Sequence, residues 1–155
     1  MAAREDMGSW LEGGRPADPG AADGLGLPAA GPGARAALGR RLVALAVDWT
    51  LCLLISAAFF EAAPMATLAV FAAENVLLVG TTGTTVGHRL VGIAVRDLAT
   101  ARGAAGRARA AVPPPGLGRA AVRTVLLCLV VPAVVWDADG RGLHDRGAGT
   151  VIVRR

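Results

Sequence analysis

Two long apolar runs dominate the pattern of hydrophobic and polar positions along the chain. They cover residues 42–60 and 65–79, and a short turn that ends at Pro64 separates them. Each run approaches the roughly 20 apolar residues that a helix needs to cross ~30 Å of hydrocarbon, and proline suits the first turn of a helix. The pattern therefore predicts an antiparallel transmembrane hairpin with spans at about 41–60 and 64–81.

A third apolar segment lies at about 119–136. Its most apolar part, Thr124–Trp136, is shorter than a typical span and contains Pro132, which interrupts a helix. Runs of this length are more often interfacial, re-entrant or core helices. We expect a segment that enters the membrane and returns, and the alternative is a spanning helix that begins near Gly118 with flanking arginines at the surface.

The ends of the chain differ from its centre. Residues 1–37 are rich in Gly, Pro and Ala, which predicts a disordered N-terminal tail before a membrane domain at 38–155. Two short β-branched segments, Gly92–Asp97 and Thr150–Arg154, predict strands that can pair beside the membrane. The alternative for the basic chain end is contact with anionic lipid headgroups. The predicted fold class is an all-α integral membrane protein with a helical hairpin, a third short apolar helix and a short cytoplasmic strand pair.

Positive charge gives the orientation of this fold. All 16 basic residues are Arg, the formal net charge is +4, and the turn between the first two runs contains no Arg. Because Arg-rich flanks stay in the cytoplasm, residues 1–38, 83–123 and 137–155 are predicted to be cytoplasmic. The predicted location is the cell membrane, as a multi-pass protein with a cytoplasmic N terminus.

Composition narrows the function classes. Hydrophobic residues form 54% of the chain, aromatic residues 4%, and two cysteines are present. Arginines beside apolar runs favour a membrane surface over a nucleic-acid groove, and two cysteines exclude a disulfide framework or a thiolate zinc site. The motifs of common hydrolases, metalloproteases and nucleotide-binding enzymes are missing from the sequence. We expect no enzyme activity, cofactor or metal, and we expect the lipid bilayer and a homo- or hetero-oligomer as partners.

Charged residues inside the apolar runs are the main candidates for function. Asp48 lies about two helical turns after Arg41 on the same face, and Glu74 lies at nearly the same depth in the second run. A charge deep in the bilayer costs on the order of 2.5–3.5 kcal/mol, so it needs a partner or a function. These residues form either a polar clamp between the helices or a site for a proton or cation.

The sequence near the C terminus adds a second group of candidates. His144, Asp145 and Arg146 are consecutive and are followed by a Gly-Ala-Gly turn and the last predicted strand. His88 stands where a phosphate-binding loop would have Lys. We interpret both histidines as hydrogen-bonding residues at the membrane surface, and a metal site formed by the pair is a weaker interpretation.

Three motifs resemble the RDD family of bacterial membrane proteins. RRLVALAVDW contains the RxxAxxxD pattern with Arg41, Ala44 and Asp48; GTTVGHRLVGIAVRD and LHDRGAGTVIV resemble the later motifs, and Asp145 is the second signature acid. The resemblance covers about 38–155, the N-terminal tail is similar to those of actinobacterial members, and His88 replaces the Lys of many members. The resemblance implies a role in transport, since some members are linked to sodium–proton exchange.

Two functions follow from these observations. The first is a membrane component that contributes to transport of an ion or small solute. The second is a non-transporting membrane adaptor that uses its Arg-rich loop and strands to recruit a cytoplasmic or membrane partner.

Overall fold

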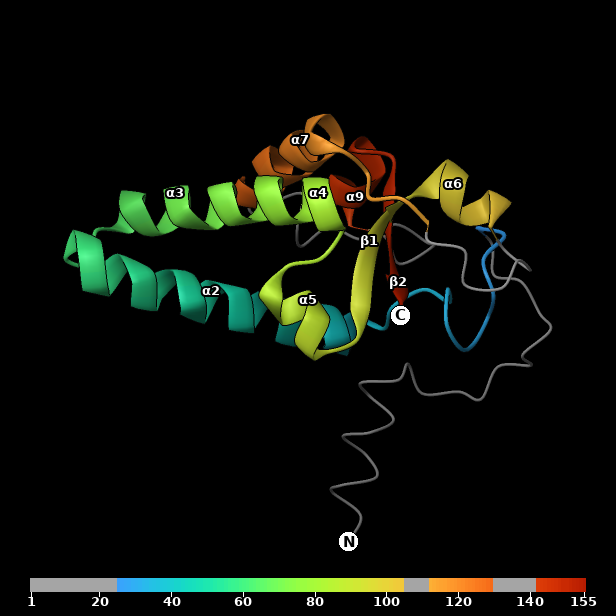
Figure 1. Cartoon of the computed structure of the whole chain (residues 1–155), viewed down its shortest axis with the longest axis horizontal. Helices are drawn as coiled ribbons and strands as arrows, with labels where there is room; N and C mark the ends of the chain where they lie inside the picture. Colours follow the sequence, from blue (N-terminus) through green and yellow to red (C-terminus); the bar gives the residue numbers. More distant parts are fainter. Residues whose placement is uncertain (1–24, 105–111, 130–141) are drawn as a thin grey trace, which may run out of the picture.

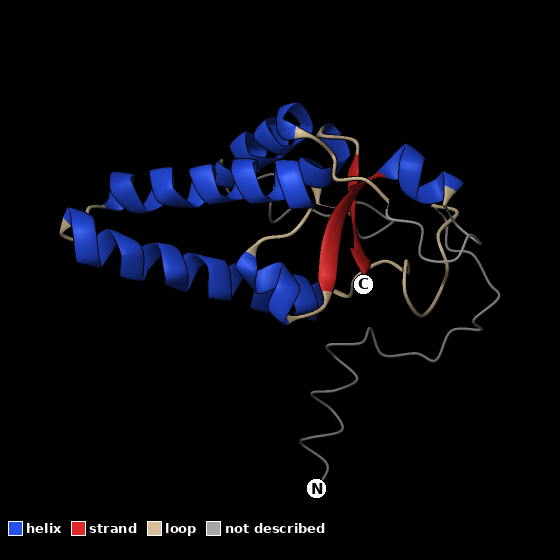
Figure 2. Ribbon diagram, in the orientation of Figure 1, coloured by secondary structure: helices blue, strands red, loops and turns tan. Residues whose placement is uncertain are grey.

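A computed structural model describes residues 25–104, 112–129 and 142–155 of the chain. In this part of the chain the fold is mostly helical, with one antiparallel strand pair at the end of a long helical hairpin (Figures 1 and 2). The predicted combination of a helical hairpin and a strand pair is therefore confirmed.

The hairpin consists of two long helical arms that lie side by side (Figure 1). Its first arm is α2 (Leu38–Phe60); its second runs through α3 (Pro64–Glu74), the π-helical turn η1 (Asn75–Val79) and α4 (Gly80–Thr82). Glu61, with a φ of 54°, directs the chain through the tight turn between the arms. By length and composition, both arms are long and apolar enough to cross a membrane.

Short elements gather at the open end of the hairpin, away from this turn (Figure 1). They are α5 (Val86–Leu90), β1 (Ile93–Asp97), α6 (Leu98–Gly103), α7 (Leu117–Cys128), α9 (Leu143–Gly147) and β2 (Thr150–Arg154).

The hairpin has an inverted distribution of polarity. The buried side chains of α2 are small or polar and recur every three or four residues along one face: Arg41, Ala44, Asp48, Cys52 and Ser56. Its large apolar side chains are exposed instead, among them Leu54 and Phe59, which are 63% and 78% exposed. In a water-soluble protein, an amphipathic helix buries its apolar face. This pattern therefore places the apolar groups of α2 toward the surroundings and its polar groups toward the other helices.

The two strands pair in antiparallel register, with Val95 opposite Ile152. Their β-branched side chains favour extended backbone and are buried at the open end of the hairpin. The other edge of β2 is covered by residues 33–36, because Ala36 donates to the Ile152 carbonyl and Gly33 to the Arg154 carbonyl, both at 2.9 Å.

Residues 25–37 fall within the predicted N-terminal tail, but they pack against the rest of the chain. Leu25 and Leu27 are buried with Val151 and Val153 of β2. Two buried leucines and the backbone hydrogen bonds to β2 hold this segment against the strands, although its composition is rich in Gly and Pro. The packed unit therefore begins before α2, and residues 1–24 lie outside the described part.

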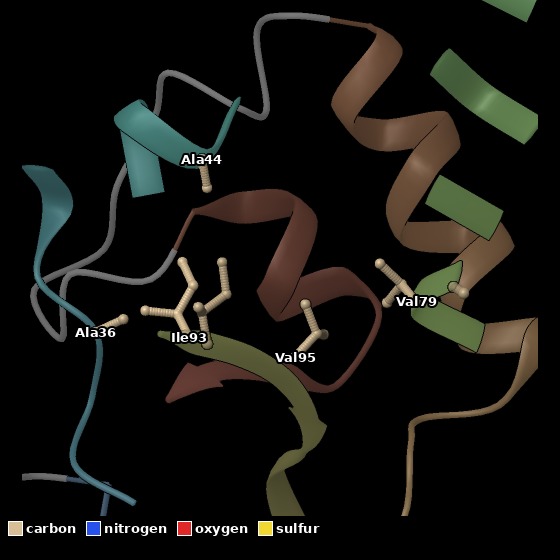
Figure 3. Close-up of a cluster of buried hydrophobic side chains, with 7 residues drawn as sticks. Ala36, Ala44, Val79, Ile93 and Val95 are labelled. Carbon is tan, nitrogen blue, oxygen red and sulfur yellow. The ribbon is translucent and has the colours of Figure 1, made fainter. Parts of the chain in front are cut away.

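A small apolar cluster joins the hairpin to the strands (Figure 3). Its buried members come from the segment before α2, from α2, η1 and α7, and from both strands: Ala36, Ala44, Val79, Ile93, Val95, Ala120 and Ile152. Because most of these side chains are small, the helices and strands approach closely around the neighbouring polar groups.

The third apolar segment is described only in part. Helix α7 packs against η1, α4 and α9, and it buries Arg123 and Thr124 while Val125 stays 60% exposed. Residues 130–136, which include Pro132, lie outside the described residues. The structure thus gives a helix that shares the inverted polarity of α2, and a third spanning helix is not shown.

Candidate functional site

A buried ion cluster lies where α2, α7 and α9 meet. The carboxylate of Asp145 is its centre: Oδ1 accepts a hydrogen bond from Nε of Arg123 at 2.9 Å, and Oδ2 lies 3.9 Å from Nη1 of Arg41. The side chains of these three residues are 1–6% exposed. Isolated charges are very costly to bury, so each member of the cluster depends on the others.

Neighbouring residues fix the position of Asp145. The hydroxyl of Thr150, the first residue of β2, donates to Oδ1 at 3.1 Å, and Nε2 of His144 lies 3.6 Å from Oδ2. Burial raises the pKa of Asp145, but the positive charges of Arg123, His144 and Arg41 and the hydrogen bond from Arg123 outweigh this effect and lower the pKa to about 2. Asp145 is therefore a fixed negative charge at neutral pH.

Asp48 is held by the segment that follows the hairpin. The Thr85 hydroxyl donates to its Oδ2 at 2.5 Å, and the backbone N–H of Gly87 donates to its Oδ1 at 2.7 Å. Both oxygens of Asp48 thus accept hydrogen bonds from α5 or its N-cap. This is the kind of protein partner that a carboxylate in an apolar helix requires.

The approach of α5 to α2 depends on a glycine. A Cβ atom at position 87 would overlap the Ala44 carbonyl oxygen and would lie 2.9 Å from Oδ1 of Asp48. Only glycine can therefore bring its backbone N–H to Asp48 in this arrangement.

His88 belongs to the N-terminal cap of α5. The Thr85 N–H donates to Nδ1 of His88 at 3.2 Å, and the His88 N–H donates to the Thr85 hydroxyl oxygen at 3.2 Å. The Thr85 hydroxyl oxygen also lies 2.8 Å from Nδ1 of His88, so the ring contacts both the backbone and the side chain of the N-cap residue. Burial lowers the pKa of His88 to about 3, with a further contribution from Arg123, so the ring is neutral at pH 7.

A cavity of about 60 Å³ lies beside both the buried ion cluster and the carboxylate of Asp48. It is lined by residues of both hairpin arms, α5, α7, α9 and β2: Arg41, Leu42, Leu45, Asp48, Asn75, His88, Arg123, Leu127, His144 and Ile152. Asn75 begins the π-helical turn, and such turns are frequent at functional sites.

Asp48 and Glu74, which the sequence places at nearly the same depth, both meet the start of α5. Glu74 accepts a hydrogen bond from the Cys52 thiol at 3.2 Å, and Asp48 bonds to Thr85 and Gly87. Arg41 contacts Asp145 and donates through Nε to the Ala36 carbonyl at 3.0 Å. Glu74 also accepts a hydrogen bond from the backbone of Val86, the residue before Gly87, and it lies within electrostatic range of Asp48.

Other predicted residues divide between the cluster and its surroundings. Arg41, Asp48, His88 and His144 all line the cavity, whereas Arg146 is exposed. Both histidines are buried inside the fold, and their predicted place at a membrane surface stays a prediction.

The site contains three buried residues that are not among the predicted site residues: Arg123, Thr85 and Asn75. In the sequence, Arg123 has the position of a charge that flanks an apolar run. The spacing of Thr85 and His88 is a signal that was available, because an N-cap threonine often exchanges hydrogen bonds with the residue three positions later.

The described residues also bear on metal binding. Among residues 25–104, 112–129 and 142–155, no group of three or more His, Cys, Asp or Glu side chains is placed to hold a metal ion.

The comparisons with known proteins find no matching family model, no similar curated protein and no similar solved structure.

Proposed function

We propose that this chain is a multi-pass membrane protein of the RDD type that contributes to transport of an ion or small solute. The single observation that carries the proposal is the cavity between the hairpin arms, which is lined by Asp48 of α2, Asn75 of η1 and the buried guanidinium of Arg123. Ionisable groups that face the interior of an apolar helical assembly commonly mark a path for ions or solutes.

The inverted polarity of the helices supports the membrane location. Large apolar side chains on α2 and α7 face outward, and the charged and polar side chains of the same helices face one another. Lipid satisfies the first group, and protein partners satisfy the second. A contiguous apolar surface of this kind is a membrane or interaction surface rather than a surface for water.

The RDD resemblance agrees with this proposal. Its signature residues are Arg41, Asp48 and Asp145, which come from α2 and α9 and are all buried. Arg41 contacts Asp145 directly, and Asp48 lines the same cavity as Arg41. Transport requires polar groups that are held away from lipid yet adjoin space for a solute, and this arrangement supplies both.

The experiment is reconstitution of the full chain into liposomes that contain a pH-sensitive dye, with flux measured in sodium, potassium and choline salts. We expect flux that is lost in Asp48→Asn. The matched control is Glu61→Gln, which removes an exposed carboxylate at the turn of the hairpin and is expected to keep the flux. Equal flux in wild type and Asp48→Asn would overturn the role of Asp48. An intact oligomer without flux in any salt would favour the alternative function, a membrane adaptor.

A further inference from the structure

Two arginines hold the same short loop at the end of the second hairpin arm. The loop is residues 82–84, where α4 ends. Arg89 of α5 donates through Nε to the Thr84 hydroxyl at 3.0 Å, and Arg96 of β1 donates through Nη1 to the Thr82 carbonyl at 3.5 Å. The hydroxyl oxygens of Thr82 and Thr84 lie 3.0 Å apart. The loop therefore holds two guanidinium groups that come from different elements.

Gly83, the middle residue of this loop, lets the side chain of Arg96 lie across it. Gly83 has a φ of 73°, in the left-handed region that favours glycine. A Cβ atom there would overlap Nη1 of Arg96 and would lie 2.8 Å from the Val95 carbonyl oxygen. A glycine at this position therefore determines where the guanidinium group is held.

Further arginines lie beside α5 and the start of β1. Arg40 donates through Nη1 to the Val91 carbonyl at 2.8 Å, and the backbone N–H of Arg155 donates to the Gly92 carbonyl at 2.9 Å. Burial lowers the pKa of Arg96, and the positive charge of Arg155 lowers it further, so these two arginines are within electrostatic range of each other. Like charges held this close favour a negatively charged partner.

The acids of the described residues do not supply that partner. Asp97 follows Arg96 in the chain, but its carboxylate pairs with Arg119 and accepts from Thr100. Asp48 lies nearest to the loop among the buried acids, and its two oxygens accept from Thr85 and Gly87. The remaining acids in the described part of the chain are buried or lie along the hairpin: Glu61, Glu74 and Asp145.

Exposed apolar side chains adjoin these arginines. Val86 and Leu90 are four residues apart in α5 and so share one face, and Leu90 is 72% exposed. Helix α5 packs against α2, whose neighbouring Leu38 and Leu42 are also exposed. A leucine that enters the acyl chains beside an arginine at the headgroup level is typical of a segment at the membrane boundary.

We infer that Arg89 and Arg96 bind the phosphate of an anionic lipid headgroup, and that Leu90 contacts the acyl chains of the same lipid. A guanidinium group can give two parallel hydrogen bonds to a phosphate, and the cytoplasmic leaflet is rich in anionic lipids. The inference rests on the membrane location in the proposed function, but it does not depend on transport.

The test is native mass spectrometry of the purified full chain in a neutral detergent, titrated with dioleoyl phosphatidylglycerol or dioleoyl phosphatidylcholine. The two lipids have the same acyl chains and both contain a phosphate, but choline cancels the negative charge. We expect phosphatidylglycerol to bind about fivefold or more tightly than phosphatidylcholine. Equal affinity for the two lipids would overturn the inference.

Arginine variants test the position of the site. Arg89→Gln should weaken the binding of phosphatidylglycerol by about fivefold or more, since charge-assisted hydrogen bonds are the strong ones. The matched control is Arg146→Gln, which removes the same charge from an exposed position in α9 and should keep the affinity within about twofold of wild type. Equal losses in the two variants would show a general attraction to positive charge and would overturn the site.

Arg96→Gln should weaken binding to a similar extent. Because the side chain of Arg96 packs over Gly83, its removal can also disturb the loop. The thermal unfolding midpoint of each variant separates these effects. Arg89 is exposed, so Arg89→Gln decides the test if Arg96→Gln does not fold. Wild-type affinity in a folded Arg89→Gln variant would overturn the assignment.

A free phosphate ester is the other possible source of the same chemistry. Glycerol phosphate has the headgroup phosphate without acyl chains, so it should bind about tenfold or more weakly than phosphatidylglycerol. Leu90→Ser should weaken the binding of phosphatidylglycerol by about threefold and leave that of glycerol phosphate unchanged. Glycerol phosphate that binds as tightly as the lipid would overturn the lipid as the occupant.

The outcomes separate this inference from the proposed function. Selective binding of phosphatidylglycerol that depends on Arg89, in a chain without flux in liposomes, would keep the lipid site and overturn transport. Flux that depends on Asp48, in a chain that binds both lipids equally, would keep transport and overturn the lipid site.

Discussion

The backbone N–H of Gly87 donates to the carboxylate of Asp48 at 2.7 Å, and this bond ties α5 to the first arm of the hairpin. A second bond, from the Thr85 hydroxyl, occupies the other oxygen of the same carboxylate. A charged group in the middle of an apolar helix thus receives its hydrogen bonds from residues that follow the second arm. Asp48 therefore helps to fix where the chain goes after the hairpin.

Gly87→Ala should destabilise the protein by about 1–3 kcal/mol, the range for overpacking a close contact. The added Cβ would overlap the Ala44 carbonyl oxygen, so α5 must move away from Asp48. The measurement is the thermal unfolding midpoint in detergent. Gly118→Ala is the control, because it lies in α7 with open space around the added carbon, and it should be neutral or slightly stabilising. Equal midpoints for Gly87→Ala and wild type would contradict the close approach of α5.

Asp145→Asn should cost about 3–5 kcal/mol, because it leaves the buried guanidinium groups of Arg123 and Arg41 without their negative partner. Chemical denaturation followed by circular dichroism measures this loss. The control is Asp97→Asn, whose ion-pair partner Arg119 is half exposed. A partly exposed pair contributes about 1 kcal/mol or less. A loss in Asp145→Asn as small as that in Asp97→Asn would show that the buried cluster does not hold α7, α9 and α2 together.

Stability should decrease as the pH falls from 6.5 toward 3. The folded pKa of His88, about 3, lies below its ordinary value of 6.5, so unfolding takes up a proton between these pH values. The free energy of unfolding then falls by up to about 1.4 kcal/mol per pH unit, and the contribution of the neutral ring is fully present only above pH 6.5. Thermal midpoints at pH 7 and pH 5 test this effect, and His88→Gln should remove it. Measurements in a His144→Gln background isolate His88, and a pH dependence that survives His88→Gln there would assign it to another group.

The turn of the hairpin and the chain end should label from opposite sides of the membrane. Figure 1 places the C terminus at the open end of the hairpin, away from the turn that contains Glu61. Arginines gather at that open end, which predicts a cytoplasmic chain end. In a background without Cys52 and Cys128, a thiol in Glu61→Cys should react with an impermeant reagent in intact cells, and one in Arg155→Cys should react only after permeabilisation. Labelling of Arg155→Cys from outside would instead indicate three spans.

The sequence alone determined the helical hairpin and the two strands. Apolar runs of nearly membrane length, separated by a turn before Pro64, specify two helices whatever else they contact. Segments rich in β-branched residues specify Ile93–Asp97 and Thr150–Arg154 as strands, and these bounds agree closely with the predicted ones. Both patterns are local, because they depend on residues that are near one another in the chain.

Only the tertiary structure decided which charges meet. Periodicity places Arg41 and Asp48 on one face, but it cannot show that Asp145, more than a hundred residues further along the chain, becomes the partner of Arg41. In the sequence, Arg123 has the position of a charge that flanks an apolar run and faces water. In the structure, the polar positions of these helices face other helices instead, and Arg123 is buried. Long-range packing brings α2, α7 and α9 together, and the cost of burying a charge alone then selects the pairs.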